Sequence, residues 1–341
     1  MVRKPFHKRI LHFKNLPLLA VTIVVILLFF FINNSYLSVK NIYNLMYSMS
    51  FSGIIACGIG CLLISGAVDL SAGAIGCFAG VFAAVMMRAG LSWPVALVLA
   101  LVFGILAGLL NAFFANVLNF MPFIATIGMM SVWSGLAFIL GNGTMVPIAQ
   151  TNQGFYQLST KYIYIIQPQR FGIPLPFLIM VILFLIYGFI LNLTPFGRQI
   201  YMCGGNRTAA RLAGISPKKT TTILFMNSGL VSALAGLLVA ANNRMGAPTN
   251  VTGMEMNSIA ASILGGISFM GGAGGMSGAF IGLLLINCFN TGLISAGLPA
   301  YWQVAAQGLL LLVALLADYF TTKARMGSIS ASDTAKLLTA N

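Results

Sequence analysis

The stretch LPLLAVTIVVILLFFFI, Leu16 to Ile32, carries no charged residue, and its apolar side chains are continuous rather than alternating. In a bilayer every backbone polar group must be satisfied within the protein, so only helices or closed barrels span the membrane. About 20 residues of helix cross the hydrocarbon core. The continuous apolar pattern therefore predicts a membrane-spanning helix, and we expect no signal cleavage because the NNSYLS that follows offers no small-residue cleavage site.

The rest of the chain has a similar composition. It is 59% hydrophobic and 6% charged, with a mean hydropathy of +0.96, whereas soluble domains carry about 25% charged residues. We therefore expect an all-α polytopic membrane protein, a single transmembrane domain over residues 1–341. About ten spanning segments are expected, near 16–32, 42–64, 66–88, 93–118, 122–140, 174–193, 220–241, 256–270, 274–297 and 302–320. The eighth is short and rich in glycine, which indicates a broken or re-entrant helix.

The basic residues predict the orientation of the chain. With the N-terminus in the cytoplasm and alternating crossings, thirteen of the 18 Lys and Arg fall inside and five outside, as the positive-inside rule requires. The cytoplasmic parts are then an N-terminal tail (1–15), a loop (194–219) and a C-terminal tail (322–341), while 141–173 forms an external loop. Because the net charge of +14 sits in short loops, we expect contact with the lipid bilayer and none with nucleic acid.

Only four acids occur in the chain: Asp69, Glu255, Asp318 and Asp333. Asp69 lies within the apolar CLLISGAVDLSAG, where an acid facing lipid would cost several kcal/mol. It should therefore face the bundle interior, a water-filled path or the membrane surface. Its carboxylate can accept backbone N–H bonds two or three residues on, as a helix N-cap. A structural cap and a role on the substrate path both remain open.

Other polar residues in apolar segments are candidates for the same path. TGMEMNSIAASILGGISFMGGAGGMSG, residues 252–278, contains Glu255 before a glycine cluster that permits broken helices with exposed backbone; a tight helix hairpin is the alternative. Asparagines in buried helices also commonly bond a neighbouring helix. The candidate substrate-pathway residues are Asp69, Ser71, Asn111, Thr126, Glu255, Asn257 and Ser268.

The cytoplasmic loop contains a predicted short helix. In NRTAARLAGIS, Asn206 is a good cap, the interior is rich in alanine, Gly214 marks the end and Pro217 follows, which are the usual start and stop signals. Such a helix could simply bind anionic lipid headgroups, or it could receive a partner protein.

Five stretches in order resemble one family, the permease subunits of ATP-binding-cassette importers for monosaccharides (the ribose, galactose, arabinose, xylose and autoinducer-2 group). GAVDLSAG is similar to its G-x-x-DLS-x-G signature, and PFIATIGMM to its P-F-I-x-T-x-G stretch. FGRQIYMCGGNRTAARLAGI is similar to its cytoplasmic loop, ASILGGISFMGGAGG to its glycine cluster, and YWQVAAQGLLLLVALLAD to its last helix. Thr208 and Asn257 stand where the family often has an acid.

The resemblance implies a vitamin-B12-permease-like (type II) importer fold in the bacterial inner membrane. It implies a second permease copy, identical or related, two cytoplasmic ATPases that bind ATP and Mg, and a periplasmic or lipid-anchored sugar-binding protein. The implied ATPase-coupling residues are Gly205, Asn206, Arg207, Ala209, Ala210, Arg211, Gly214 and Ile215.

Three classes of function are weighed. The first is the ATP-driven importer permease, without catalytic residues or cofactor of its own, since the nucleotide motif G-x-x-x-x-G-K-[ST] is absent from the sequence. The second is a proton- or cation-coupled secondary transporter with Asp69 and Glu255 as carriers. The third is an intramembrane enzyme or metal site, which is disfavoured because both histidines, His7 and His12, lie in the N-terminal tail.

Overall fold

A computed structural model gives the structure of the chain. It describes residues 16–166 and 171–299, together with 301, 302, 304–306, 308, 309, 312, 313 and 316. The expected cytoplasmic tails, 1–15 and 322–341, lie outside the described residues, and so does much of the tenth expected segment.

Helices account for most of the described chain. They are α2 (Leu16–Ile32), α3 (Val39–Ile64), α4 (Ala72–Arg88), α5 (Trp93–Ala112), α6 (Pro122–Leu140), α7 (Gln153–Thr160), α8 (Leu175–Leu193), α9 (Pro195–Gly205), α10 (Arg207–Leu212), α11 (Pro217–Asn243), α12 (Met254–Leu264) and α13 (Met276–Ser295), with the short turns η1 (Asn34–Leu37) and η2 (Phe113–Val117).

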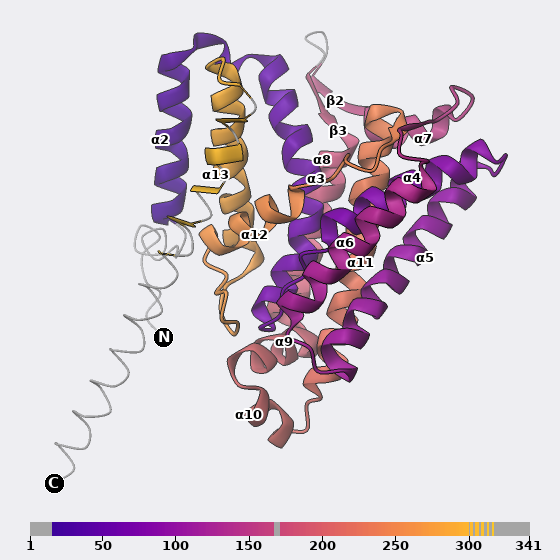
Figure 1. Ribbon diagram of the computed structural model, residues 1–341. Helices are drawn as coiled ribbons and strands as arrows, with labels where there is room; N and C mark the ends of the chain where they lie inside the picture. Colours follow the sequence, from indigo (N-terminus) through magenta and orange to yellow (C-terminus); the bar gives the residue numbers. More distant parts are fainter. Residues whose placement is uncertain are drawn as a thin grey trace.

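Six of these helices are long and apolar enough to cross a membrane: α3, α5 with η2, α6, α8, α11 and α13. Two shorter apolar helices, α2 and α4, add to them, and the described residues between 301 and 316 are also helical. A polytopic helical membrane protein is confirmed. Helices α9 and α10 lie at one end of the bundle and α7 at the other (Figure 1), as the expected placement of 194–219 and 141–173 at opposite ends requires.

Two expected segments are shorter than the sequence indicated. Segment 66–88 is helical only from Ala72, because Gly66 adopts a φ of 76° that ends α3 and turns the chain into the bundle interior. Segment 256–270 is helical only to Leu264, and a glycine-rich loop continues to Gly275. The eighth segment is therefore an 11-residue half-helix followed by irregular backbone, which agrees with the expected break.

Short strands accompany the helices of this all-α fold. Two short antiparallel pairs join the connections: β1 (Val146–Pro147) with β4 (Met245–Gly246), and β2 (Tyr162–Ile166) with β3 (Phe171–Pro174). Both pairs involve the 141–173 connection. Its backbone groups lie outside the helices and find partners by pairing as strands.

Small residues allow the central helices to approach closely. A Cβ on Gly104 of α5 would lie 2.5 Å from the carbonyl oxygen of Gly229 in α11, and one on Gly76 of α4 would lie 2.8 Å from that of Ser232. At these small residues the helix backbones themselves are in contact. They place α11 against both α4 and α5, at the centre of the bundle.

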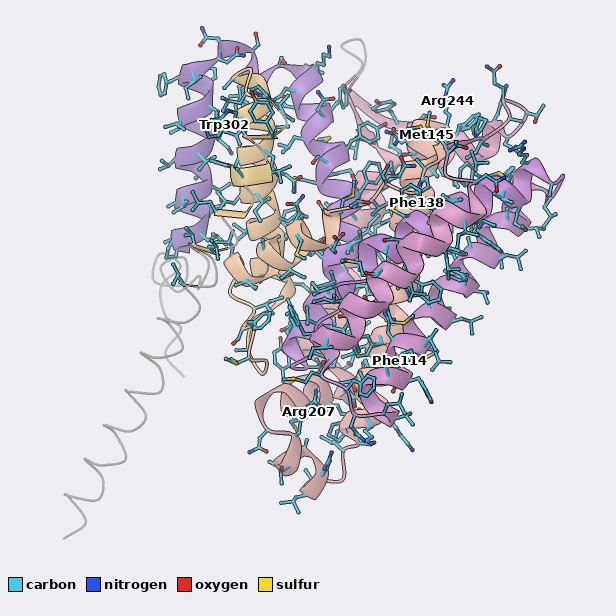
Figure 2. The ribbon with its side chains drawn as sticks, viewed as in Figure 1. Phe114, Phe138, Met145, Arg207, Arg244 and Trp302 are labelled. Atoms are coloured by element: carbon cyan, nitrogen blue, oxygen red, sulfur yellow. The ribbon has the colours of Figure 1, made fainter. Side chains whose placement is uncertain are left out.

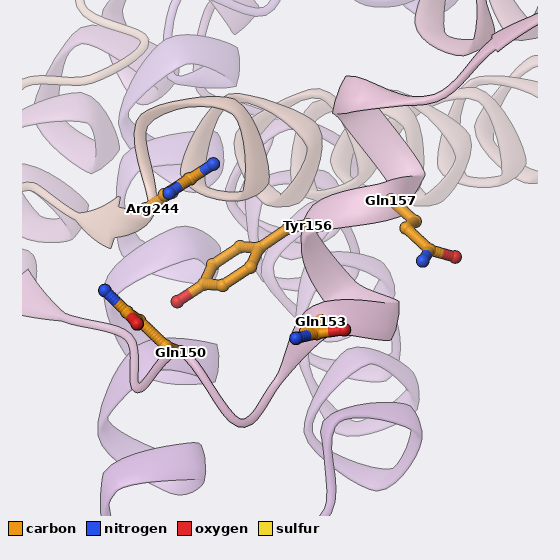
Figure 3. A pocket seen from close by; sticks show the side chains of 5 residues that line it. All are labelled: Gln150, Gln153, Tyr156, Gln157 and Arg244. Carbon is orange, nitrogen blue, oxygen red and sulfur yellow. The ribbon is translucent and has the colours of Figure 1, made fainter.

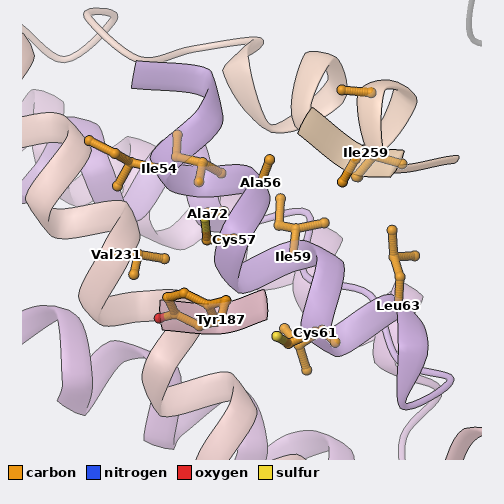
Figure 4. Close-up of a cluster of buried hydrophobic side chains, with 14 of the residues drawn as sticks. Ile54, Ala56, Cys57, Ile59, Cys61, Leu63, Ala72, Tyr187, Val231 and Ile259 are labelled. Atoms are coloured by element: carbon orange, nitrogen blue, oxygen red, sulfur yellow. The ribbon is translucent and has the colours of Figure 1, made fainter. Parts of the chain in front are cut away.

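The main apolar core surrounds α3. Cys57 and Ile59 of α3 pack in one cluster with Tyr187 of α8, Val231 of α11 and Ile259 of α12 (Figure 4). Because every residue of α3 from Met49 to Ile64 is buried, the loop that follows the helix starts inside the protein. This position brings Asp69 into the interior.

Candidate transport and coupling sites

The α3–α4 loop, residues 65–71, carries Asp69 into the protein. The N–H groups of Gly66 and Ala67 donate to the carbonyls of Leu63 and Leu62, which closes the end of α3. Such a bond pattern around a glycine of positive φ is a common helix ending. The chain then continues as irregular backbone inside the protein, and Asp69 is 0% exposed.

Four donors surround the Asp69 carboxylate. Its Oδ1 accepts from the Ser71 backbone N–H (3.0 Å), the Ser71 hydroxyl (2.7 Å) and Asn111 Nδ2 (3.3 Å). Its Oδ2 accepts from the Ser228 hydroxyl (2.8 Å). Asn111 belongs to α5 and Ser228 to α11, so one carboxylate ties the loop to two spanning helices.

The predicted cap at Asp69 is correct in its bond and wrong in its position. Asp69 does accept the N–H two residues on, but α4 begins at Ala72 and its N-cap residue is Ser71, which makes no side-chain cap bond. The Ser71 hydroxyl instead donates to Asp69 and accepts from Asn111 Nδ2 (2.7 Å). The carboxylate thus holds the turn before the helix rather than the first helical residues.

Glu255 occupies the first turn of α12 and is 6% exposed. Its Oε1 accepts from the N–H of Gly253 (3.2 Å), so the side chain reaches back over the start of its own helix. Its Oε2 lies against Gly73, where a Cβ would clash with it. Within the described chain this oxygen has no hydrogen-bond partner.

The seven candidate pathway residues do not form one site. Asp69, Ser71 and Asn111 share a hydrogen-bond network, and Glu255 approaches it from α12. Thr126 donates only within its own helix, to the carbonyls of Pro122 and Phe123, and Ser268 Oγ accepts from the Met270 N–H in the α12–α13 loop; Asn257 is half-buried two residues beyond Glu255.

Ser228 is the member of the network that sequence analysis missed. The signal was present, because Asn227 and Ser228 form a polar pair inside the apolar α11. Nothing in the local pattern, however, joins position 228 to position 69. The neighbouring Asn227 serves a different contact, since its Oδ1 accepts from the Tyr187 hydroxyl.

The short helix predicted in the 194–219 loop is confirmed as α10. Asn206 Oδ1 accepts from the N–H groups of Thr208 (2.9 Å) and Ala209 (3.0 Å), which caps the helix start. At the other end Gly214 has a φ of 78°, and the N–H of Ile215 donates to the carbonyl of Ala210. Both ends are thus fixed by residues of the loop itself.

Helix α10 presents most of its surface to the outside. Arg207, Arg211 and Leu212 are exposed, Leu212 at 87%, while Ala210 is buried against the protein. Beside it lies an open hollow of about 600 Å³ lined by Asn119, Arg211, Gly214, Ile215, Ser216, Pro217 and Lys218. Figure 2 shows Arg207 at this end of the molecule and Arg244 at the opposite end.

The opposite end carries a smaller hollow of about 310 Å³, lined by Gln150, Gln153, Tyr156, Gln157 and Arg244 (Figure 3). The Arg244 guanidinium lies over the Tyr156 ring, 5.3 Å from its centroid. Burial raises the pKa of Tyr156 above its usual value, and the charge of Arg244 acts in the opposite direction. Both described acids are in the interior, so this arginine pairs with neither.

One known protein family matches most of the chain in sequence. Residues 41–315 match the family model described as branched-chain amino acid transport system, permease component. The chain belongs to this permease family. The match includes the Asp69 network, α10 and the α12–α13 loop, so every candidate site of this permease lies within the family region.

Three curated relatives of this permease have sugar-transport names. The ribose import permease of Bacillus subtilis is 34% identical, over 84% of this chain and 87% of that protein. The xylose transport permease of Haemophilus influenzae is 31% identical, over 88% and 94%. The L-arabinose transport permease of Escherichia coli is 33% identical, over 84% of both chains. The resemblance to the monosaccharide permeases is confirmed.

A solved structure, PsaBC from Streptococcus pneumoniae in complex with Fab, aligns with this permease over 84% of this chain and 92% of that chain, at 17% identity and a TM-score of 0.42.

Proposed function

We propose that this chain is the membrane-spanning subunit of an ATP-binding-cassette importer, which moves a monosaccharide or a similar small sugar-like solute into a bacterial cell. The observation that carries the proposal is the set of ribose, xylose and arabinose permeases that match more than four fifths of the chain at 31–34% identity. The family model alone would also admit a branched-chain amino acid. The relatives favour the sugar.

Helix α10 is the proposed docking point for a cytoplasmic ATPase. It is fixed at both ends, projects from the bundle and exposes Arg207, Arg211 and Leu212. An exposed leucine that follows two arginines suits insertion into a protein groove better than contact with water alone. In this proposal the partner ATPase binds ATP and Mg, and the permease itself catalyses no reaction.

The hollow at Arg244 is the proposed contact for the external binding protein. Its cation and three glutamine side chains offer donors to acidic and polar groups of a partner, and such charges mainly guide association and register. A second copy of the permease, identical or related, completes the proposed assembly in the inner membrane, with both termini in the cytoplasm.

The proposed role of Asp69 is to position helices beside the path rather than to carry a cation or hold sugar. All four donors around its carboxylate come from the protein, so it is already committed to the fold. An importer supplied by a binding protein must also release its substrate easily, and a tight internal site would trap it.

The second candidate, a proton- or cation-coupled transporter, is favoured by one observation. Glu255 Oε2 is buried without a hydrogen-bond partner in the described chain, and a lone acid in a membrane protein is a common proton carrier. Glu255→Gln distinguishes the two, because a carrier needs the ionisable group whereas the bond from the Gly253 N–H only needs an oxygen.

The test is uptake of labelled pentoses and hexoses by cells that express the permease with and without its ATPase and binding protein. The proposal expects uptake of at least one sugar that depends on the ATPase, and retained uptake in Glu255→Gln. Uptake that persists without the ATPase and disappears in Glu255→Gln would favour the coupled transporter instead.

A further inference from the structure

The last turn of α9 touches two loops through bare backbone. A Cβ on Gly204 would overlap the carbonyl oxygen of Ile64 at the end of α3 and would lie 2.5 Å from the backbone nitrogen of Gly272. The Gly272 N–H donates to the same Ile64 carbonyl, at 2.8 Å. Three separate segments therefore meet at one carbonyl group.

Two further contacts join the same three segments. A Cβ on Gly271 would lie 2.9 Å from the Cα of Gly66 and 3.0 Å from the Cα of Gly204. The Tyr201 hydroxyl donates to the carbonyl of Gly274, at 2.8 Å. Helix α9 cannot shift against the α3–α4 and α12–α13 loops without breaking these contacts, because closely packed backbone does not deform continuously.

The junction links the two candidate sites of the permease. On one side Asn206 follows α9 directly: its N–H donates to Met202 of α9, and its side chain caps α10. On the other side Gly66 precedes Asp69 by three residues in the same buried loop. A contiguous series of contacts thus runs from the exposed α10 to the carboxylate that holds α5 and α11.

We propose that Gly204 is a positioning residue for transport, which keeps α9 close enough to the α3–α4 loop for motion of α10 to reach the Asp69 network. The inference rests on the proposed function, since that function supplies the ATPase that moves α10. It goes further than that function because it names the contact, at Gly204, through which motion of α10 reaches the Asp69 network. Coupling of this kind needs a structural element whose position depends on both sites. Helix α9, which contacts the α3–α4 loop through Gly204 and leads directly into α10, is such an element.

The chain offers a matched control in another helix. A Cβ on Gly135 of α6 would have no heavy atom within 4 Å, and Gly135 belongs to none of the candidate sites. Gly204→Ala and Gly135→Ala are the same chemical change in a helix, but only the first adds an atom at the junction. Tyr201→Phe is a second probe, because it adds no atom and removes only the bond to Gly274.

The first measurement is hydrogen exchange of the purified permease in nanodiscs, which needs no substrate. Gly204→Ala is expected to lose amide protection at residues 265–275, where the Gly272 N–H bond to Ile64 is displaced, whereas Gly135→Ala retains it. Tyr201→Phe is expected to lose part of the same protection. Equal protection in all three variants and the wild type would overturn the inference.

The second measurement is ATP hydrolysis by the full complex with the binding protein, with and without sugar. Gly204→Ala is expected to keep basal hydrolysis and membrane abundance but to lose stimulation by roughly fivefold or more, the lower range for coupled sites. Gly135→Ala is expected to stay stimulated. Full stimulation in Gly204→Ala would overturn the inference. If no tested sugar stimulates even the wild type, the proposed function fails. The hydrogen-exchange measurement then tests by itself whether Gly204 holds α9 against the two loops.

Discussion

Replacing Asp69 by leucine removes the acceptor at the centre of the buried network. The Ser71 N–H, the Ser71 hydroxyl and the Ser228 hydroxyl then lose the carboxylate as an acceptor, whereas Asn111 Nδ2 keeps the Ser71 hydroxyl oxygen. A buried donor without a partner costs roughly 1–3 kcal/mol. The Ser228 hydroxyl can turn to a carbonyl of its own helix. The Ser71 N–H and the Ser71 hydroxyl remain without this acceptor, so we expect a loss of about 2–6 kcal/mol.

Asparagine at the same position should be far milder. Its amide oxygen can replace Oδ1 and accept from Ser71 and Asn111, while its amide nitrogen donates to Ser228, whose hydroxyl can accept. The loss is then mainly the extra strength of hydrogen bonds to a charged acceptor, about 1 kcal/mol. Asp69→Asn should therefore retain much of the transport, and Asp69→Leu should lose abundance or transport.

The assay is uptake normalised to the amount of permease in the membrane, with thermal unfolding of each purified variant. Thr126→Val is the matched control, because Thr126 is equally buried but donates only within its own helix. This variant should keep both normal uptake and normal thermal stability. If Asp69→Asn abolished transport at normal abundance and stability, the charge itself would be needed, and the positioning role of Asp69 would be refuted.

Three other predictions concern orientation and α10. A reporter fused after Arg211 should read cytoplasmic and one near Gln153 external, since charge placement requires this; the reverse pair of readings would exclude the orientation. Gly214→Val should uncouple ATP hydrolysis from uptake at normal membrane abundance, because a φ of 78° strains a β-branched residue; wild-type uptake would count against it. Asn206→Ala should weaken α10 by about 1 kcal/mol and lower ATPase binding in a pull-down titration, whereas Asn206→Asp, also a good cap, should bind normally.

Features set by neighbouring residues were predictable from the sequence. The cap at Asn206, the end at Gly214 and the restart at Pro217 are signals within twelve residues of one another, and the structure has all three. Continuous apolar runs likewise predicted the long spanning helices, because their length is set by the bilayer.

Features that depend on distant residues were not predictable. Ser228 meets Asp69 across 159 positions, and the helix packing that joins them depends on close glycine contacts such as Gly104 with Gly229. The same reason explains the start of α4 at Ala72. Tertiary hydrogen bonds hold residues 66–71 as irregular buried backbone, although their apolar composition alone favours a longer helix.

The central claim, import driven by a separate ATPase, is tested most directly by accumulation of labelled sugar in proteoliposomes that contain the permease and its ATPase, with the loaded binding protein outside. ATP is trapped inside or omitted, and proton and sodium gradients are collapsed by ionophores. The account predicts accumulation that requires ATP and is unchanged by the ionophores. Accumulation without ATP that the ionophores abolish would contradict it.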